Sequence, residues 1–150
     1  MSETDPPAPP ARGAAVVGEA ADRPRQPPRS TRVVVVDDQE DFLAWVCGEL
    51  ERAGSFQVVG RSLRPEQALA TVQETSPDLL LVDFDMPGMN GIEVIRQVRQ
   101  QAPSVRVVLM SLNDNRVFDV LARTAGAIGF LPKQRVSQEE IRLLLDESAG

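Results

Sequence analysis

Five residues in this sequence carry side chains that could act together in chemistry: Asp37, Asp38, Asp83, Ser111 and Lys133. The chain contains no histidine and a single cysteine. Imidazole is therefore excluded as a base, metal ligand or phosphate carrier, and thiolate metal sites are excluded as well. The remaining carboxylates, hydroxyl and ammonium group favour chemistry with a hard cation such as Mg²⁺.

All five residues follow short apolar runs: 33–36 before Asp37 and Asp38, 79–82 before Asp83, 107–110 before Ser111, and 128–131 before Lys133. Runs this short and apolar predict strands that are buried on both faces of a parallel sheet. In an open parallel sheet, ligands and chemistry collect at the carboxyl ends of the strands. The sequence therefore predicts that the five side chains meet at one edge.

Helical patterns separate these strands and must bring their ends together. We expect strands at 33–36, 56–59, 78–82, 105–110 and 128–131, and helices at 39–53, from Pro65, at 91–101, from Asn113 or Asp114 to 125, and after Ser137. In the fourth helix, Val117, Val120 and Leu121 are expected to face the core. Five βα units predict an α/β, flavodoxin-like (βα)5 doubly wound sandwich, with a five-stranded parallel sheet in the order 2-1-3-4-5.

The composition sets the class of protein. Residues 1–31 hold seven of the twelve prolines and no aromatic residue, which predicts a disordered tail before a domain at 32–150. A net charge of −6 argues against nucleic acid or an anionic membrane as the main partner. No apolar run approaches the ~20 residues that span a bilayer, so we expect a cytoplasmic protein. Cys47 is expected to be a buried structural thiol.

Clustered carboxylates repel one another, so at least one pKa should rise unless a cation lies among them. A Mg²⁺ ion held by Asp38 and Asp83 would remove this conflict. Lys133 would add a positive charge and Ser111 a hydroxyl donor. Together these groups suit transfer of a phosphoryl group to Asp83, which would form an acyl phosphate.

Residues 32 to about 148 resemble a response-regulator receiver domain of bacterial two-component signalling, of the type that often precedes a helix-turn-helix output domain. The matching segments are VVVVDD (33–38), PDLLLVDFDMPGMNG (77–91), VVLMS (107–111) and GFLPK (129–133). The resemblance implies a phosphorylation-dependent switch that receives its phosphoryl group from a histidine kinase or a phosphotransfer protein.

The resemblance also implies a role for each site residue. Asp83 resembles the phosphoacceptor, Asp38 a direct Mg²⁺ ligand, Asp37 its water-mediated neighbour, Asp85 a ligand through its backbone carbonyl, Lys133 the ammonium that pairs with the phosphoryl group, and Ser111 and Phe130 the pair that moves on activation. Activation would reshape the face made by the fourth helix, the fifth strand and the fifth helix. That face would then bind a downstream protein or a second copy of the chain.

The sequence departs from the family pattern near the site. Pro132 precedes Lys133 and Gln134 follows it, whereas many members have proline directly after the lysine. Leu112 stands where a small residue is common, beside the path of water to the acyl phosphate, and predicts slow self-dephosphorylation. The side chain of Asp85 adds a charge that could repel donors or steer water.

Three alternatives concern the output and the activity. Because the sequence stops just after the last helix, the chain is expected to be a single-domain regulator or the receiver part of a transcription regulator. A pseudo-receiver that acts only as an interaction module is a second possibility. Asp83-x-Asp85 is also similar to the motif of haloacid-dehalogenase-type phosphatases, but those place it after the first strand and usually carry a cap domain. We therefore expect at most self-phosphorylation and slow self-dephosphorylation, and no enzymatic turnover.

Overall fold

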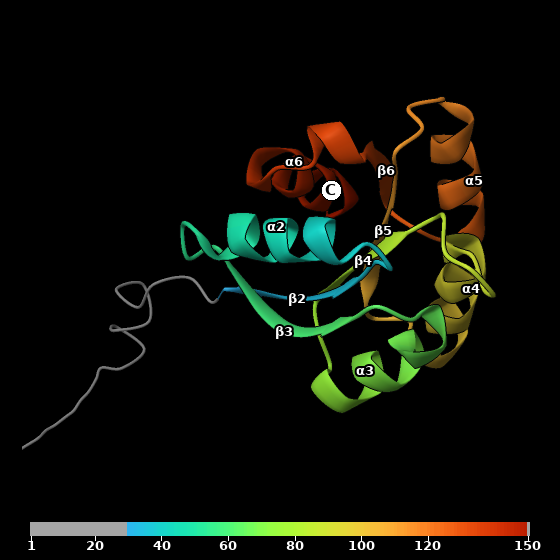
Figure 1. Ribbon diagram of the computed structural model, residues 1–150, viewed down its shortest axis with the longest axis horizontal. Helices are drawn as coiled ribbons and strands as arrows, with labels where there is room; N and C mark the ends of the chain where they lie inside the picture. Colours follow the sequence, from blue (N-terminus) through green and yellow to red (C-terminus); the bar gives the residue numbers. More distant parts are fainter. Residues whose placement is uncertain (1–29, 150) are drawn as a thin grey trace, which may run out of the picture.

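The computed structural model describes residues 30–149 and contains one parallel sheet of five strands (Figure 1). The strands are β2 (Thr31–Val36), β3 (Phe56–Ser62), β4 (Leu79–Asp83), β5 (Arg106–Ser111) and β6 (Gly129–Pro132). Their order is β3-β2-β4-β5-β6. Counted along the chain this is 2-1-3-4-5, so the predicted fold class and strand order are confirmed. Residues 1–29 of the predicted tail lie outside the described residues.

Helices cover both faces of the sheet (Figure 1). They are α2 (Glu40–Glu51), α3 (Ala68–Thr75), α4 (Gly91–Gln101), α5 (Val117–Ala125) and α6 (Gln138–Ala149), with short 3₁₀ turns η2 (Pro65–Gln67) and η3 (Lys133–Arg135). Helices α2 and α6 pack on one face, and α3, α4 and α5 pack on the other. Among the described residues, no helix is long and apolar enough to cross a bilayer.

The central strand β4 is buried on both faces, as its unbroken apolar run predicts. Leu79 and Leu81 pack in the layer of α2 and α6, whereas Leu80 and Val82 pack in the layer of α3, α4 and α5. Each of these side chains is fully buried, which stabilises the fold by about 1.5–3 kcal/mol per side chain. Asp83 is therefore fixed at the end of the most deeply buried strand. Cys47 is also buried, as expected.

Hydrogen bonds at the start of α4 fix the turn that follows β4. The side chain of Asn90 accepts a hydrogen bond from the Glu93 amide, and the Glu93 side chain accepts one from the Asn90 amide. This capping box fixes the start of α4. Gly91 then donates its amide proton to the carbonyl of Phe84. The loop that follows Asp83 is thereby closed at both ends.

The predicted orientation of α5 is wrong. Val117, Val120 and Leu121 are 47%, 62% and 42% exposed, whereas Phe118 and Ala122 pack against the core. Spacing alone allows either helical face to turn inward. The fully buried Ala122 lets the helix approach the sheet closely, and the larger aliphatic side chains are left at the surface.

The predicted cap of α5 is also wrong, because the helix begins at Val117 with Arg116 at the N-cap and no side-chain cap bond. The side chains of Asn113 and Asn115 instead accept hydrogen bonds from the amides two residues further on, at Asn115 and Val117. Asparagine readily forms such local turns. These turns extend the loop after β5 and delay the start of the helix.

We expect Gly91→Ala to lower the free energy of unfolding by about 2–3 kcal/mol, since a tightly packed site must shift to admit the methyl group. A Cβ atom at this position would lie 2.5 Å from the Asp83 carbonyl oxygen and 2.7 Å from Leu109 Cδ1. Denaturant titration measures the change. Gly48→Ala is the matched control, because nothing lies within 4 Å of its added Cβ and alanine favours a helix interior by about 0.5–1 kcal/mol. Equal effects of the two substitutions would contradict the steric explanation.

Candidate functional site

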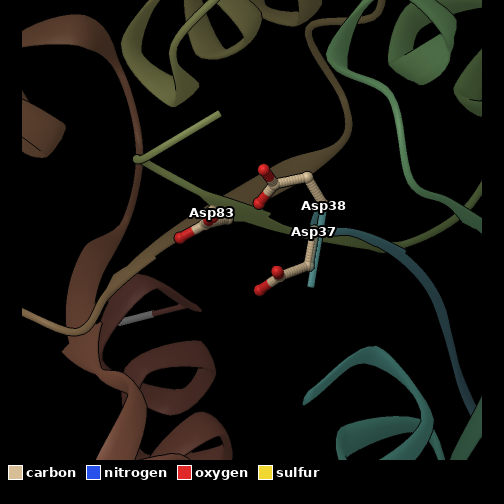
Figure 2. A group of neighbouring side chains, drawn as sticks. All are labelled: Asp37, Asp38 and Asp83. Atoms are coloured by element: carbon tan, nitrogen blue, oxygen red, sulfur yellow. The ribbon is translucent and has the colours of Figure 1, made fainter. Parts of the chain in front are cut away.

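The ends of four strands bring the residues predicted from the sequence to one edge of the sheet. Asp37 and Asp38 follow β2, Asp83 ends β4, Ser111 ends β5, and Lys133 follows β6. Figure 2 shows the carboxyl groups of Asp37, Asp38 and Asp83 gathered beside the ends of β2 and β4. Oxygen atoms from these three groups lie within 4.8 Å of one another. Parallel pairing of the strands is what aligns them.

A buried ammonium group joins two of the carboxylates. Lys133 Nζ lies 2.7 Å from Asp37 Oδ2 and 3.3 Å from Asp83 Oδ1, and the three residues are at most 5% exposed. Taking such charges out of water is costly unless they are paired. The pairing therefore accounts for the inward position of Lys133, with Pro132 before it and η3 after it.

Phe42 is a neighbour of the ammonium group that the sequence did not reveal. Its ring centroid lies 4.6 Å from Lys133 Nζ, so the aromatic face stabilises the cation. The helical pattern predicts that Phe42 points inward from α2. Nothing in the sequence places it over a lysine that is distant along the chain.

One ammonium group cannot balance three carboxylates. Burial, and next the charge of Asp37, raises the pKa of Asp83 to about 7, although Lys133 opposes the shift. Burial also raises the pKa of Asp37, while hydrogen bonds from Lys133 and the Gln39 amide oppose the rise. The predicted repulsion among the carboxylates is therefore present in this cluster.

The same cluster has the donor set of a site for a hard cation. Asp38 Oδ1 is buried and has no hydrogen-bond partner among residues 30–149. Asp37 Oδ2 and Asp83 Oδ1 face the ammonium group instead. A divalent cation coordinated by carboxylate oxygens would satisfy the unpaired oxygen and reduce the repulsion. The residues present thus fit such an ion.

Ser111 is fully buried, and its hydroxyl is directed to a partner that we did not predict. Ser111 Oγ donates a hydrogen bond to Asp85 Oδ2 at 3.1 Å and accepts one from the Asn113 amide at 3.1 Å. The sequence places the Asp85 charge near the site. It does not show that this carboxylate binds the Ser111 hydroxyl.

Phe130 lies at the inner end of a row of three aromatic rings. Its ring centroid is 5.5 Å from that of Phe118, which in turn lies 4.9 Å from that of Phe84. Phe84 directly follows Asp83, so the row connects the residue after the central carboxylate to β6 through α5. Sequence reasoning missed Phe118. The available signal was its spacing of four residues from Ala122, which marks the inward face of α5.

A carboxylate cluster with a buried lysine, at the carboxyl edge of a doubly wound parallel sheet, defines a receiver-type domain. The chain belongs to the response regulator receiver domain family, whose family model matches residues 33–146. This membership confirms the resemblance seen in the sequence.

Known proteins of bacterial two-component systems support the same assignment. The chain is 37% identical over 123 residues to the transcriptional regulatory protein NarL of Mycobacterium tuberculosis, covering 82% of this chain and 57% of NarL. It is 30% identical over 118 residues to the nitrate/nitrite response regulator NarL of Escherichia coli, covering 79% of this chain and 55% of that protein. The chain therefore spans little more than half the length of these relatives.

Solved structures of receiver domains share this fold and come from the same type of response regulator. The signal receiver domain of NarL from M. tuberculosis superposes with a TM-score of 0.73 at 36% identity, covering 82% of this chain and 99% of the other. A LuxR-family response regulator from Aurantimonas gives a TM-score of 0.71 at 26% identity, covering 78% and 86%. The chain is thus a receiver domain of the NarL/LuxR type.

Without divalent cations, we expect the free energy of unfolding to fall by about 2 kcal/mol between pH 5.5 and pH 8. The folded protein holds a proton on Asp83 up to a pKa of about 7, above the ordinary value of 3.8. Between these values the folded state binds more protons than the unfolded state, so stability decreases as the pH rises.

Urea titrations in EDTA at several pH values measure the slope of the free energy of unfolding against pH. Asp83→Asn should flatten it, while Asp146→Asn, which changes an exposed aspartate of α6, should leave it unaltered. An equal slope in the wild type and in Asp83→Asn would contradict the assignment of the raised pKa.

Proposed function

We propose that this chain is a phosphorylation-dependent signalling switch in which Asp83 accepts a phosphoryl group from a phosphohistidine. The observation that carries the proposal is the buried Lys133 ammonium, 2.7 Å from Asp37 and 3.3 Å from Asp83. It supplies a fixed positive charge beside the carboxylate that would gain a dianionic group. The donor would be a histidine kinase or a phosphotransfer protein in the cytoplasm.

In the transfer step, a carboxylate oxygen of Asp83 forms a bond to phosphorus while the phosphorus–nitrogen bond of the donor breaks. The donor imidazole leaves with the electron pair and takes up a proton. Charge on the transferred group spreads over its peripheral oxygens. Lys133 would exchange part of its contact with Asp83 for one of these oxygens, and this electrostatic stabilisation is preorganised because the lysine is already buried at the site.

Mg²⁺ is the cation that we propose for the site. Asp38, Asp83 and the backbone carbonyl of Asp85 would hold it directly, and Asp37 would hold it through water. When bound, the ion would neutralise charge on the phosphoryl oxygens. The unpaired, buried Asp38 Oδ1 supports this proposal. Ionised Asp83 is the nucleophile, so its raised pKa makes a counter-charge necessary near pH 7.

The output would pass through Ser111 and Phe130 to the face formed by α5, β6 and α6. The ring row from Phe84 through Phe118 to Phe130 links that face to the residue beside Asp83. Exposed apolar side chains on α5 offer a surface for a protein target or a second copy of the chain. The relatives are transcriptional regulators, so we propose that this receiver acts within, or together with, a transcription regulator, without binding nucleic acid through its own residues.

Incubation with acetyl phosphate and Mg²⁺ should add one phosphate-sized mass per chain, measured on the intact protein. Asp83→Asn should abolish the gain, and EDTA should reduce it by at least about tenfold, because the carboxylates then repel the donor. Asp146→Asn serves as the matched control and should be modified like the wild type. A mass gain that persists in Asp83→Asn would contradict the proposal. Continuous turnover of a phosphomonoester would indicate a phosphatase instead.

We expect Leu112→Ala to shorten the lifetime of the phosphorylated protein by about two- to fivefold, because a smaller side chain admits water to the acyl phosphate. Leu112 directly follows Ser111 and is 65% exposed. Loss of the added mass is followed over time after the donor is removed. Leu143→Ala, at another exposed leucine on α6, is the control. An unchanged lifetime in Leu112→Ala would count against the shielding role.

A further inference from the structure

The single proton of the Ser111 hydroxyl is already donated to a neighbouring side chain in this structure. A serine hydroxyl has one proton to donate, and Ser111 Oγ directs it to Asp85 Oδ2 at 3.1 Å. The same oxygen accepts a hydrogen bond from the Asn113 amide. Ser111 therefore cannot donate to a group on Asp83 unless it first releases Asp85.

The Ser111 hydroxyl also begins a relay of local hydrogen bonds that reaches α5. Asn113 donates its amide proton to Ser111 Oγ, Asn115 donates its amide proton to Asn113 Oδ1, and Val117 donates its amide proton to Asn115 Oδ1. Each bond spans two residues, and Val117 is the first residue of α5. Rotation of the Ser111 side chain would therefore act on the start of this helix.

We propose that Asp85 is a positioning residue that latches Ser111, and through it the 111–117 relay, in the unphosphorylated arrangement. The proposal rests on the proposed function of Asp83 and adds a restraint to it. The Asp85 carboxylate and the phosphoryl group on Asp83 compete for one proton. Phosphorylation moves α5 only to the extent that the Ser111 hydroxyl donates its hydrogen bond to a phosphoryl oxygen instead of to Asp85.

The carboxylate makes the latch stronger than a neutral acceptor would, since hydrogen bonds to charged groups are the stronger class. Asp85 itself is exposed, so water can solvate its carboxylate once Ser111 turns away. The exchange therefore leaves no unpaired carboxylate buried in the interior. These two properties make the bond suitable as a reversible restraint, and Asp85→Asn should weaken it without removing the acceptor.

The test titrates the full chain with BeF₃⁻ at saturating Mg²⁺, using the fluorescence of Trp45. Trp45 is the only tryptophan, and the chain has no tyrosine. Its ring centroid lies 5.7 Å from that of Phe42, which covers Lys133. Asp85→Ala should bind BeF₃⁻ about five- to tenfold more tightly than the wild type, and Asp85→Asn should lie between them. Asp114→Ala, an exposed aspartate in the next loop, should change the affinity by less than about twofold.

Removal of a negative charge would by itself favour an anion, so the titration is repeated in the Ser111→Ala background. A latch predicts that the gain from Asp85→Ala shrinks there to about twofold or less. In the Ser111-containing Asp85→Ala protein, the NMR signal of the Val117 amide should also shift, before any addition, toward its position in the BeF₃⁻ complex. A gain of equal size with and without the Ser111 hydroxyl would overturn the latch and leave a simple charge effect.

The outcomes separate the latch from the proposed function. If the wild type binds BeF₃⁻ and Asp85→Ala binds it equally well, the latch is overturned while the switch stands. If neither protein binds BeF₃⁻ or accepts phosphate, both proposals fall. If only Asp85→Ala responds, the latch is supported as a bond that holds the wild type inactive.

Discussion

The ion pair that Lys133 makes with Asp37 and Asp83 is the interaction on which the rest of the site depends. The three clustered carboxyl groups at this sheet edge repel one another, and the single ammonium group offsets only part of that repulsion. The remainder appears as the raised pKa of Asp83 and as the unpaired oxygen of Asp38. The sheet edge therefore carries an excess of negative charge, which a bound divalent cation would offset.

The packing of the surrounding elements holds these charged side chains in fixed positions. Strand β4 is anchored by apolar packing on both faces, and the turn after it is fixed by the capping box of α4. Lys133 arrives from β6 with Phe42 of α2 over its ammonium group. Because these parts come from separate βα units, the site forms only when the ends of β2, β4 and β6 lie together at one edge of the sheet.

The fold and the cluster were predictable because they follow from local patterns. Apolar runs that end in polar residues define strands, and parallel topology then brings the strand ends together. The face of α5 was not predictable in this way. Val117, Val120 and Leu121 are more apolar than Ala122, yet the helix needs the small residue for its approach to the sheet. The Ser111–Asp85 bond and the contact of Phe42 with Lys133 join distant residues through side-chain geometry that no spacing encodes.

Chemical trapping of the phosphorylated residue identifies which of the three neighbouring carboxyl groups accepts the phosphoryl group. The chain is phosphorylated with acetyl phosphate and Mg²⁺, reduced with borohydride, and analysed by peptide sequencing in a mass spectrometer. Reduction converts an aspartyl phosphate to homoserine, so phosphorylation of Asp83 should give homoserine at position 83 alone. Homoserine at position 37 or 38, or none in a protein that has gained phosphate, would contradict it.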